Sequence, residues 1–184
     1  MSHPYPPHRP DLPYTGKHHY FLTFCTDQRN PVLVEEPDVT LVRTQILRAA
    51  GEEQFEMTAY CFMPDHAHLL VAGRDESSDA RKFIKLAKQY SGYYFKQRNG
   101  LQLWQRYGFE RVIRDDAELA LTLGYIVTNP VRAGLVDHPG KYPYLGSQRH
   151  TVAEMLEICE YERIFRLKAE ATVIRIGGQG GSSA

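Results

Sequence analysis

Two histidines, His66 and His68, stand one residue apart in the apolar stretch CFMPDHAHLLV. The surrounding residues predict a strand, in which side chains at positions i and i+2 lie on the same face. The two imidazoles are therefore expected side by side, and two neutral imidazoles are half of a divalent-metal site. The alternative is a half-solvated strand whose polar face carries histidines, because H-x-H is a short motif.

The segment GYIVTNPVRAGLV (Gly124–Val136) holds the residues that could complete such a site. If a helix from Asp116 continues through it, Tyr125 and Asn129 lie four residues apart and share one face. Asn129 would sit in the last turn, where Pro130 closes the helix and the amide could bend towards a metal. The ordinary alternatives are a packing tyrosine and an Asn-Pro helix stop.

The chemistry that these residues suggest is phosphoryl transfer. Two imidazoles and one amide oxygen, from His66, His68 and Asn129, would leave positions on an ion open for phosphate and water. Mg²⁺ suits the phosphate, whereas the imidazoles favour Mn²⁺ or a softer ion. A phenol is almost wholly protonated at neutral pH, so Tyr125 needs a polarised phosphorus to attack. The product would be a covalent phosphotyrosine and a free sugar hydroxyl.

A basic segment from Arg81 to Arg114 predicts a nucleic-acid partner. It holds nine basic residues and one acid, on a chain whose 22 basic and 22 acidic residues cancel. Aromatic residues are interleaved with the cations, as in proteins that stack bases and neutralise phosphates of single strands. The predicted DNA-binding residues are Arg81, Lys85, Lys88, Lys96, Arg98, Trp104, Arg106, Tyr107, Arg111 and Arg114, with Trp104 and Tyr107 as base-stacking candidates. The alternative is a solvated basic face with its aromatics in the core.

Hydrophobic periodicity predicts the elements that must position these residues. The expected order is strand 18–26, helix 37–51, strand 55–63, strand 66–73, helix 78–98, a short strand near 112–113, a helix capped by Asp115, and a short helix from Thr151. On the helix at 78–98, Phe83, Ala87, Tyr90 and Tyr94 are expected on the core side. This order resembles the ferredoxin-like split β-α-β arrangement: an α+β fold with an antiparallel sheet, plus a C-terminal helix bearing Tyr125.

The chain of 184 residues is most simply one domain. Residues 1–16 contain five prolines and are expected to form a flexible arm, and residues 148–184 a helical extension with a flexible Gly/Ser tail. Three cysteines far apart favour reduced thiols in the cytoplasm. No apolar run is long enough for a membrane span.

Two motifs resemble one known family. CFMPDHAHLLV is similar to the H-hydrophobe-H signature of single-tyrosine HUH transposases, and GYIVTNPVRAGLV to the nucleophile segment of their REP-associated tyrosine transposase branch. FERVIRDDAELA and YPYLGS fit that branch less distinctively, the latter without the expected serine pair. The resemblance covers residues 17–147 and implies a ferredoxin-like catalytic domain there.

The resemblance also implies a function. A metal-dependent cut in single-stranded DNA would leave a 5′-phosphotyrosine and a free 3′-hydroxyl, with Mg²⁺ or Mn²⁺ as cofactor. His66 and His68 would be the metal pair, Tyr125 the nucleophile and Asn129 the third ligand. The implied partner is hairpin DNA from palindromic extragenic repeats, bound at the nucleoid in the bacterial cytoplasm by a monomer or a homodimer.

Two other functions fit parts of the sequence. A ferredoxin-like module could bind nucleic-acid hairpins without chemistry, although HHYFLTF lacks the alternating Gly/aromatic pattern of RNA-recognition modules. A metallohydrolase could use His66 and His68 with Asp65, leaving Tyr125 structural. Covalent trapping separates these alternatives, because only the tyrosine mechanism links the protein to DNA.

Overall fold

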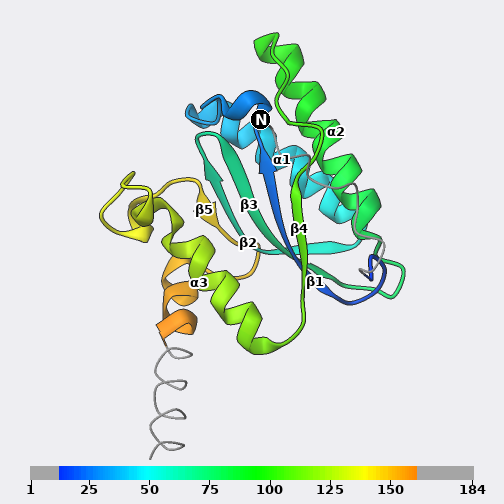
Figure 1. The fold of residues 1–184 in the computed structure, drawn as a ribbon, viewed down its shortest axis with the longest axis vertical. Helices are drawn as coiled ribbons and strands as arrows, with labels where there is room; N and C mark the ends of the chain where they lie inside the picture. The colour runs from blue at the N-terminus through cyan, green and yellow to red at the C-terminus, as the bar shows by residue number, and fades with distance from the viewer. Residues whose placement is uncertain (1–12, 161–184) are drawn as a thin grey trace, which may run out of the picture.

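The computed structural model describes residues 13–160, which form one antiparallel sheet with helices on both faces (Figure 1). The strands follow the spatial order β4-β1-β3-β2-β5. The elements are β1 (His19–Cys25), α1 (Glu36–Glu52), β2 (Phe55–Met63), β3 (His66–Gly73), α2 (Ala80–Asn99), β4 (Phe109–Ile113), α3 (Asp116–Arg132) and β5 (Leu145–Gly146). The first six elements follow the β-α-β-β-α-β order of a ferredoxin-like domain, and strands β1 to β4 have its sheet arrangement. The predicted fold class is confirmed.

The sheet separates two apolar cores. Side chains of β1 alternate between them: Leu22 and Phe24 lie in the core beneath α1 and α2, whereas Phe21 lies in the core beneath α3. Figure 1 shows α1 and α2 on one face of the sheet and α3 on the other. Because β1 and β3 are buried on both faces, a polar side chain on either strand is an exception to be explained.

The basic helix α2 has the predicted two-sided character, with one difference at its end. Its buried side chains are Ala80, Phe83, Ala87, Ser91 and Phe95. Tyr94, predicted in the core, is exposed, and the neighbouring Phe95 takes the core position. The buried residues recur every three to four positions, and this step places residue 95 rather than 94 over the sheet.

The predicted end of α3 is wrong. Its start is as expected, since the Asp115 side chain accepts a hydrogen bond from the Glu118 N–H at 2.7 Å. The helix then continues through Pro130 to Arg132. Pro130 removes only one backbone donor, and the chain turns away at Gly134, which has the positive φ of 70° that favours glycine at a helix end.

The two ends of the described chain are partly as predicted. Tyr14 is buried and Thr15 pairs with Asp79, so the last part of the expected flexible arm is packed against the domain. The helix expected from Thr151 lies at 152–160 and begins with a capping box, in which Thr151 and Glu154 exchange hydrogen bonds. The rest of the arm (1–12) and of the C-terminal extension and tail (161–184) lies outside the described residues. No helix within 13–160 is long and apolar enough to cross a membrane.

Candidate active site

The central strand β3 presents His66 and His68 on the α3 side of the sheet, as the alternation predicts. Ala67, between them, points into the opposite core beneath α1 and α2. The strand begins directly after the two-residue turn Pro64-Asp65 that joins it to β2. His68 is only 4% exposed, so the structure contradicts a merely solvated polar face.

Both imidazoles are held through their δ-nitrogens. The Asp65 carboxylate accepts a hydrogen bond from His66 Nδ1 at 2.6 Å, and Thr23 Oγ1 lies 3.0 Å from His68 Nδ1. Because a carboxylate can only accept, His66 Nδ1 carries a proton, and the ε-nitrogen is the one left to bind an ion. The two ε-nitrogens lie 3.0 Å apart.

This separation fits a shared divalent ion. Two nitrogens each about 2.1 Å from one ion, at the right angle of octahedral coordination, are about 3.0 Å apart. Burial, with smaller contributions from His66 and Arg29, lowers the pKa of His68 to about 3, so this imidazole stays neutral and able to bind a metal. His66 and His68 therefore fit as neighbouring ligands of one ion.

Asp65 lies behind His66, on the side away from the paired ε-nitrogens. Partial burial alone would raise the pKa of this carboxyl, but the hydrogen bond with His66 and the charge of Arg29 lower it overall. Arg29, in the short 3₁₀ turn η1 (Asp27–Arg29), donates to Asp65 at 3.2 Å. Asp65 thus orients His66, and residues 13–160 contain no group of three His, Cys, Asp or Glu side chains placed to hold one ion. Asp65, the third ligand that the hydrolase alternative would use, is bonded here to the δ-nitrogen of His66.

The tyrosine of α3 lies beside this histidine pair in the same chain. The Tyr125 ring centroid is 5.2 Å from that of His68, and Phe21 contacts both rings. The Arg132 guanidinium lies 5.1 Å from the centroid of the Tyr125 ring, two helical turns along α3. Tyr125 is 38% exposed, so it faces both the histidines and solvent.

The histidine pair, Phe21 and Tyr125 line one cavity of about 420 Å³. Its lining residues come from β1, β3, α3, Arg29 and residues 105–109, and are Phe21, Thr23, Cys25, Arg29, His66, His68, Gln105, Tyr107, Gly108, Phe109 and Tyr125. Gly108 is required here, because a β-carbon would lie 2.7 Å from the carbonyl oxygen of Thr23. Asn129 shares the Tyr125 side of α3 but is not among the lining residues, so its place as third ligand stays a prediction.

The family model described as "Transposase IS200 like" matches residues 14–127, well over half of the chain. The chain belongs to the IS200-like transposase family. The matched range contains the whole ferredoxin-like sheet up to β4, the histidine pair and Tyr125.

Named relatives of this IS200-like family member are REP-associated tyrosine transposases. A protein assigned to that group in Haemophilus influenzae is 29% identical over 148 residues, covering 74% of this chain and 83% of the relative. The one from Escherichia coli K12 is 27% identical over 129 residues, covering 68% and 73%. A solved REP-associated tyrosine transposase bound to a REP hairpin shares the fold, with a TM-score of 0.62 at 23% identity, covering 73% of this chain and 79% of that one. The predicted resemblance is confirmed.

Several predicted DNA-binding cations of this IS200-like family member have partners within the fold. Arg98 pairs with Asp38 at 3.0 Å, and Arg111 with Glu118 at 3.2 Å. The Arg81 guanidinium lies 4.1 Å from the centroid of the Tyr14 ring, and that of Arg106 lies 5.3 Å from the centroid of the Tyr107 ring. Lys85, Lys96 and Arg114 are exposed. The basic segment is thus partly structural, and the DNA contacts of all ten predicted residues remain predictions.

Lys88 and Trp104 are not the exposed groups that the sequence predicted. Lys88 Nζ donates to the carbonyl oxygens of Gln105 at 2.6 Å and Arg106 at 3.2 Å, and burial lowers its pKa to about 8. Trp104 is only 5% exposed, and its indole N–H donates to Ser91 Oγ at 2.8 Å. The segment that contains Trp104 folds over this part of α2, so Trp104 is buried and Lys88 is half-buried. Tyr107, 42% exposed, remains available for stacking.

Four residues in contact with the candidate site or its supporting groups were not predicted from the sequence: Phe21, Thr23, Arg29 and Arg132. Thr23 stands opposite His68 in the β1–β3 register, and that register is a long-range property. Arg132 had a local signal, because its spacing of seven from Tyr125 returns it to the same side of a helix. Predicting that the helix ended at Pro130 concealed this relationship.

Proposed function

We propose that this IS200-like transposase is a metal-dependent single-strand DNA endonuclease and strand-transferase that acts on palindromic hairpin DNA through Tyr125. The observation that carries the proposal is the 5.2 Å separation of the Tyr125 and His68 rings in one cavity. A nucleophile and a candidate ion site that share a cavity can meet the same phosphodiester. The binding-module alternative gives no reason for this juxtaposition.

The ion would be held by the ε-nitrogens of His66 and His68, with the Asn129 amide as the expected third ligand, and Mg²⁺ or Mn²⁺ would supply charge neutralisation at the phosphate. The protein's own groups prepare this role. Asp65 holds a proton on His66 Nδ1 and aims the ε-nitrogen at that of His68. Burial keeps His68 neutral.

Tyr125 supplies the covalent step. Its hydroxyl oxygen bonds to phosphorus and gives up its proton to water, while the bond from phosphorus to the 3′ oxygen breaks. The leaving oxygen takes a proton from water and becomes a free 3′-hydroxyl, and the 5′ phosphate stays on Tyr125. Arg132, 5.1 Å from the ring centroid, places positive charge beside the phenol as it loses its proton.

The substrate is inferred from the relatives and from the cations. A neighbour with the same fold is bound to a REP hairpin, and the two named relatives carry REP association in their names. In this chain Lys85, Lys96 and Arg114 are exposed charges that could neutralise backbone phosphates. Hairpin DNA with an unpaired flank is the substrate that this combination supports best.

The test is covalent trapping. The protein is incubated with end-labelled hairpin DNA and Mn²⁺ and run on a denaturing gel. We expect a labelled protein–DNA adduct from the wild type, and no adduct from Tyr125→Phe, which should still bind the hairpin. Tyr93→Phe, on the exposed side of α2, is the matched control and should form the adduct normally. An adduct undiminished in Tyr125→Phe would refute the assignment.

A further inference from the structure

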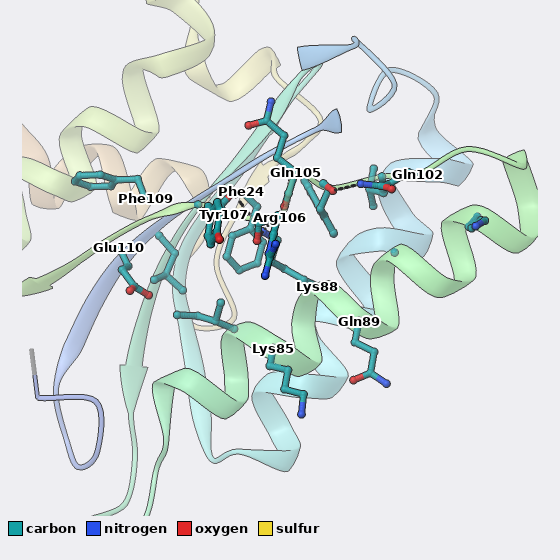
Figure 2. A pocket seen from close by; sticks show the side chains of 17 residues that line it. Phe24, Lys85, Lys88, Gln89, Gln102, Gln105, Arg106, Tyr107, Phe109 and Glu110 are labelled. Atoms are coloured by element: carbon teal, nitrogen blue, oxygen red, sulfur yellow. Dashed lines mark hydrogen bonds between the residues drawn. The ribbon is translucent and has the colours of Figure 1, made fainter. Parts of the chain in front are cut away.

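A second and larger cavity, of about 520 Å³, lies between α2 and the segment that leads into β4 (Figure 2). The cavity that contains Tyr125 is called the catalytic cavity here. Leu22 and Phe24 of β1 line the second cavity, whereas Phe21 and Thr23 of the same strand line the catalytic cavity. The two cavities therefore lie on opposite faces of β1. Gln105, Tyr107, Gly108 and Phe109 line both, so one short segment forms a wall of each.

The lining of the second cavity is apolar inside and cationic at its rim. Phe24, Leu103 and Trp104 are buried and form its floor. Gln89 and Gln102 also line it, and the Gln102 amide donates one hydrogen bond to the carbonyl oxygen of Trp104 at 3.0 Å. Exposed cations also line it, namely Lys85, Lys96 and Arg106, together with one acid, Glu110, which accepts a hydrogen bond from Tyr14.

Its wall is held firmly in place. Figure 2 shows Lys88 reaching from α2 towards the facing segment. The Lys88 ammonium donates to three successive carbonyl oxygens there, those of Gln105, Arg106 and Tyr107, at 2.6 to 3.4 Å. Trp104 is fixed by its bond to Ser91, which also belongs to α2. The cavity is thus shaped by satisfied polar contacts rather than by a loose loop.

Gly92 is an independent sign that the space is kept open. It lies inside α2 and lines the cavity. Glycine is among the least favourable residues inside a helix. A β-carbon at this position would meet only Trp104 Cδ1, at an ordinary contact distance of 3.7 Å. The packing of α2 therefore does not require glycine, and a larger side chain would project into the cavity.

We propose that this cavity holds the base of one unpaired DNA nucleotide from the strand that enters the catalytic cavity. The inference rests on the proposed function and extends it to substrate recognition. A flat apolar base suits the aromatic floor and the exposed ring of Tyr107. Glutamine amides can pair with base edges, and the lysines and arginine at the rim can neutralise the flanking phosphates.

The position of the cavity supports this occupant over an unrelated small molecule. A strand that reaches Tyr125 passes the segment 105–109, because that segment is part of the catalytic wall. A neighbouring nucleotide turned across the sheet edge would meet the second cavity on the other side of the same segment. One DNA strand could therefore engage both cavities at once.

Trp104 gives a direct readout, because it is the only tryptophan of the chain and lies in the cavity floor. The probe is an unpaired DNA of mixed sequence, about ten nucleotides long, within the usual site size of single-strand binders. We expect saturable quenching of Trp104 emission that follows binding measured by anisotropy of the labelled DNA. Binding without any change in Trp104 emission would overturn the proposal.

A cavity-filling variant tests the same point by another route. Gly92→Leu should fold as stably as the wild type, since it replaces a helix-interior glycine, and should weaken DNA binding about tenfold with loss of the quenching. Gly51→Leu is the matched control, because a β-carbon there meets nothing within 4 Å, and it should behave as the wild type. Equal affinity for the folded Gly92→Leu variant would also overturn the proposal.

The two proposals can fail separately. Quenching of Trp104 without any Tyr125 adduct would leave the nucleotide site standing and refute the covalent mechanism. Adduct formation with an unresponsive Trp104 would refute the nucleotide site alone. If Gly92→Leu does not fold, the wild-type quenching measurement still decides.

Discussion

The ε-nitrogens of His66 and His68 face each other at 3.0 Å within one chain. Their δ-nitrogens are occupied by Asp65 and Thr23, so neither ring can turn its other nitrogen into the gap without losing a partner. Two lone pairs at this distance repel unless a cation or a shared proton lies between them. The arrangement is therefore prepared for a positive charge, and Tyr125 stands beside it.

Removing the charge behind His66 should weaken the ion site. In Asp65→Asn the amide no longer enforces a proton on His66 Nδ1, and the side chain loses its pairing with Arg29. We expect Mn²⁺ affinity to fall by about 10- to 100-fold, as is typical when a carboxylate behind a histidine ligand is lost. Titration calorimetry with Mn²⁺ measures this. Asp137→Asn, at an exposed ion pair with Lys141, is the control, and an unchanged affinity in Asp65→Asn would contradict the assigned role.

The guanidinium beside the nucleophile should matter for rate rather than for binding. In Arg132→Gln the phenolate that develops on Tyr125 loses a neighbouring positive charge. We expect the single-turnover rate of adduct formation at saturating DNA to fall about tenfold, equivalent to about 1.4 kcal/mol of barrier. Arg132→Lys keeps the charge and should recover most of the rate. Loss of hairpin affinity with an unchanged rate would instead make Arg132 a DNA contact.

Burial of Lys88 predicts a particular dependence of stability on pH. Its pKa is lowered from 10.5 to about 8, mainly by burial. Between these values the unfolded chain holds the proton and the folded chain does not, so the contribution of this group to the free energy of unfolding rises with pH. Urea denaturation from pH 7 to 10 should therefore show the wild type gaining stability relative to Lys88→Met, in which the group cannot titrate. Parallel curves would mean that the three carbonyl contacts keep the ammonium charged.

An exposed cation of α2 should contribute charge alone to DNA binding. Lys85 is exposed at the rim of the second cavity, unlike the half-buried Lys88. We expect Lys85→Ala to weaken hairpin binding modestly and to reduce the slope of log affinity against log salt by about one. Anisotropy titrations at several salt concentrations measure the slope. Lys141→Ala, which removes an exposed cation paired with Asp137, is the control and should keep the wild-type slope. If the Lys85→Ala slope is unchanged, the phosphates run elsewhere.

The sequence alone determined the local parts of this protein. Strand-forming runs on either side of the Pro64-Asp65 turn placed β2 and β3 at their observed bounds, and side-chain alternation set His66 and His68 on one face. Capping signals located the start of α3 and of the helix at 152–160. Spacing of four put Tyr125 and Asn129 on one side of a helix. Each of these depends on neighbouring residues, so sequence pattern was sufficient.

Only the tertiary structure decided which distant groups meet. Thr23 reaches His68 through the β1–β3 register, and a register is set by how whole faces pack. Lys88 and Trp104 have the composition of exposed DNA contacts, yet Lys88 donates to the segment before β4 and the Trp104 indole is bonded to Ser91, so neither projects freely into solvent. A helical pattern shows which side of α2 is cationic, but not which residues of that side another segment buries. The second cavity forms between α2, β1 and the segment that leads into β4. These elements are far apart in the sequence, so no local pattern could predict the cavity.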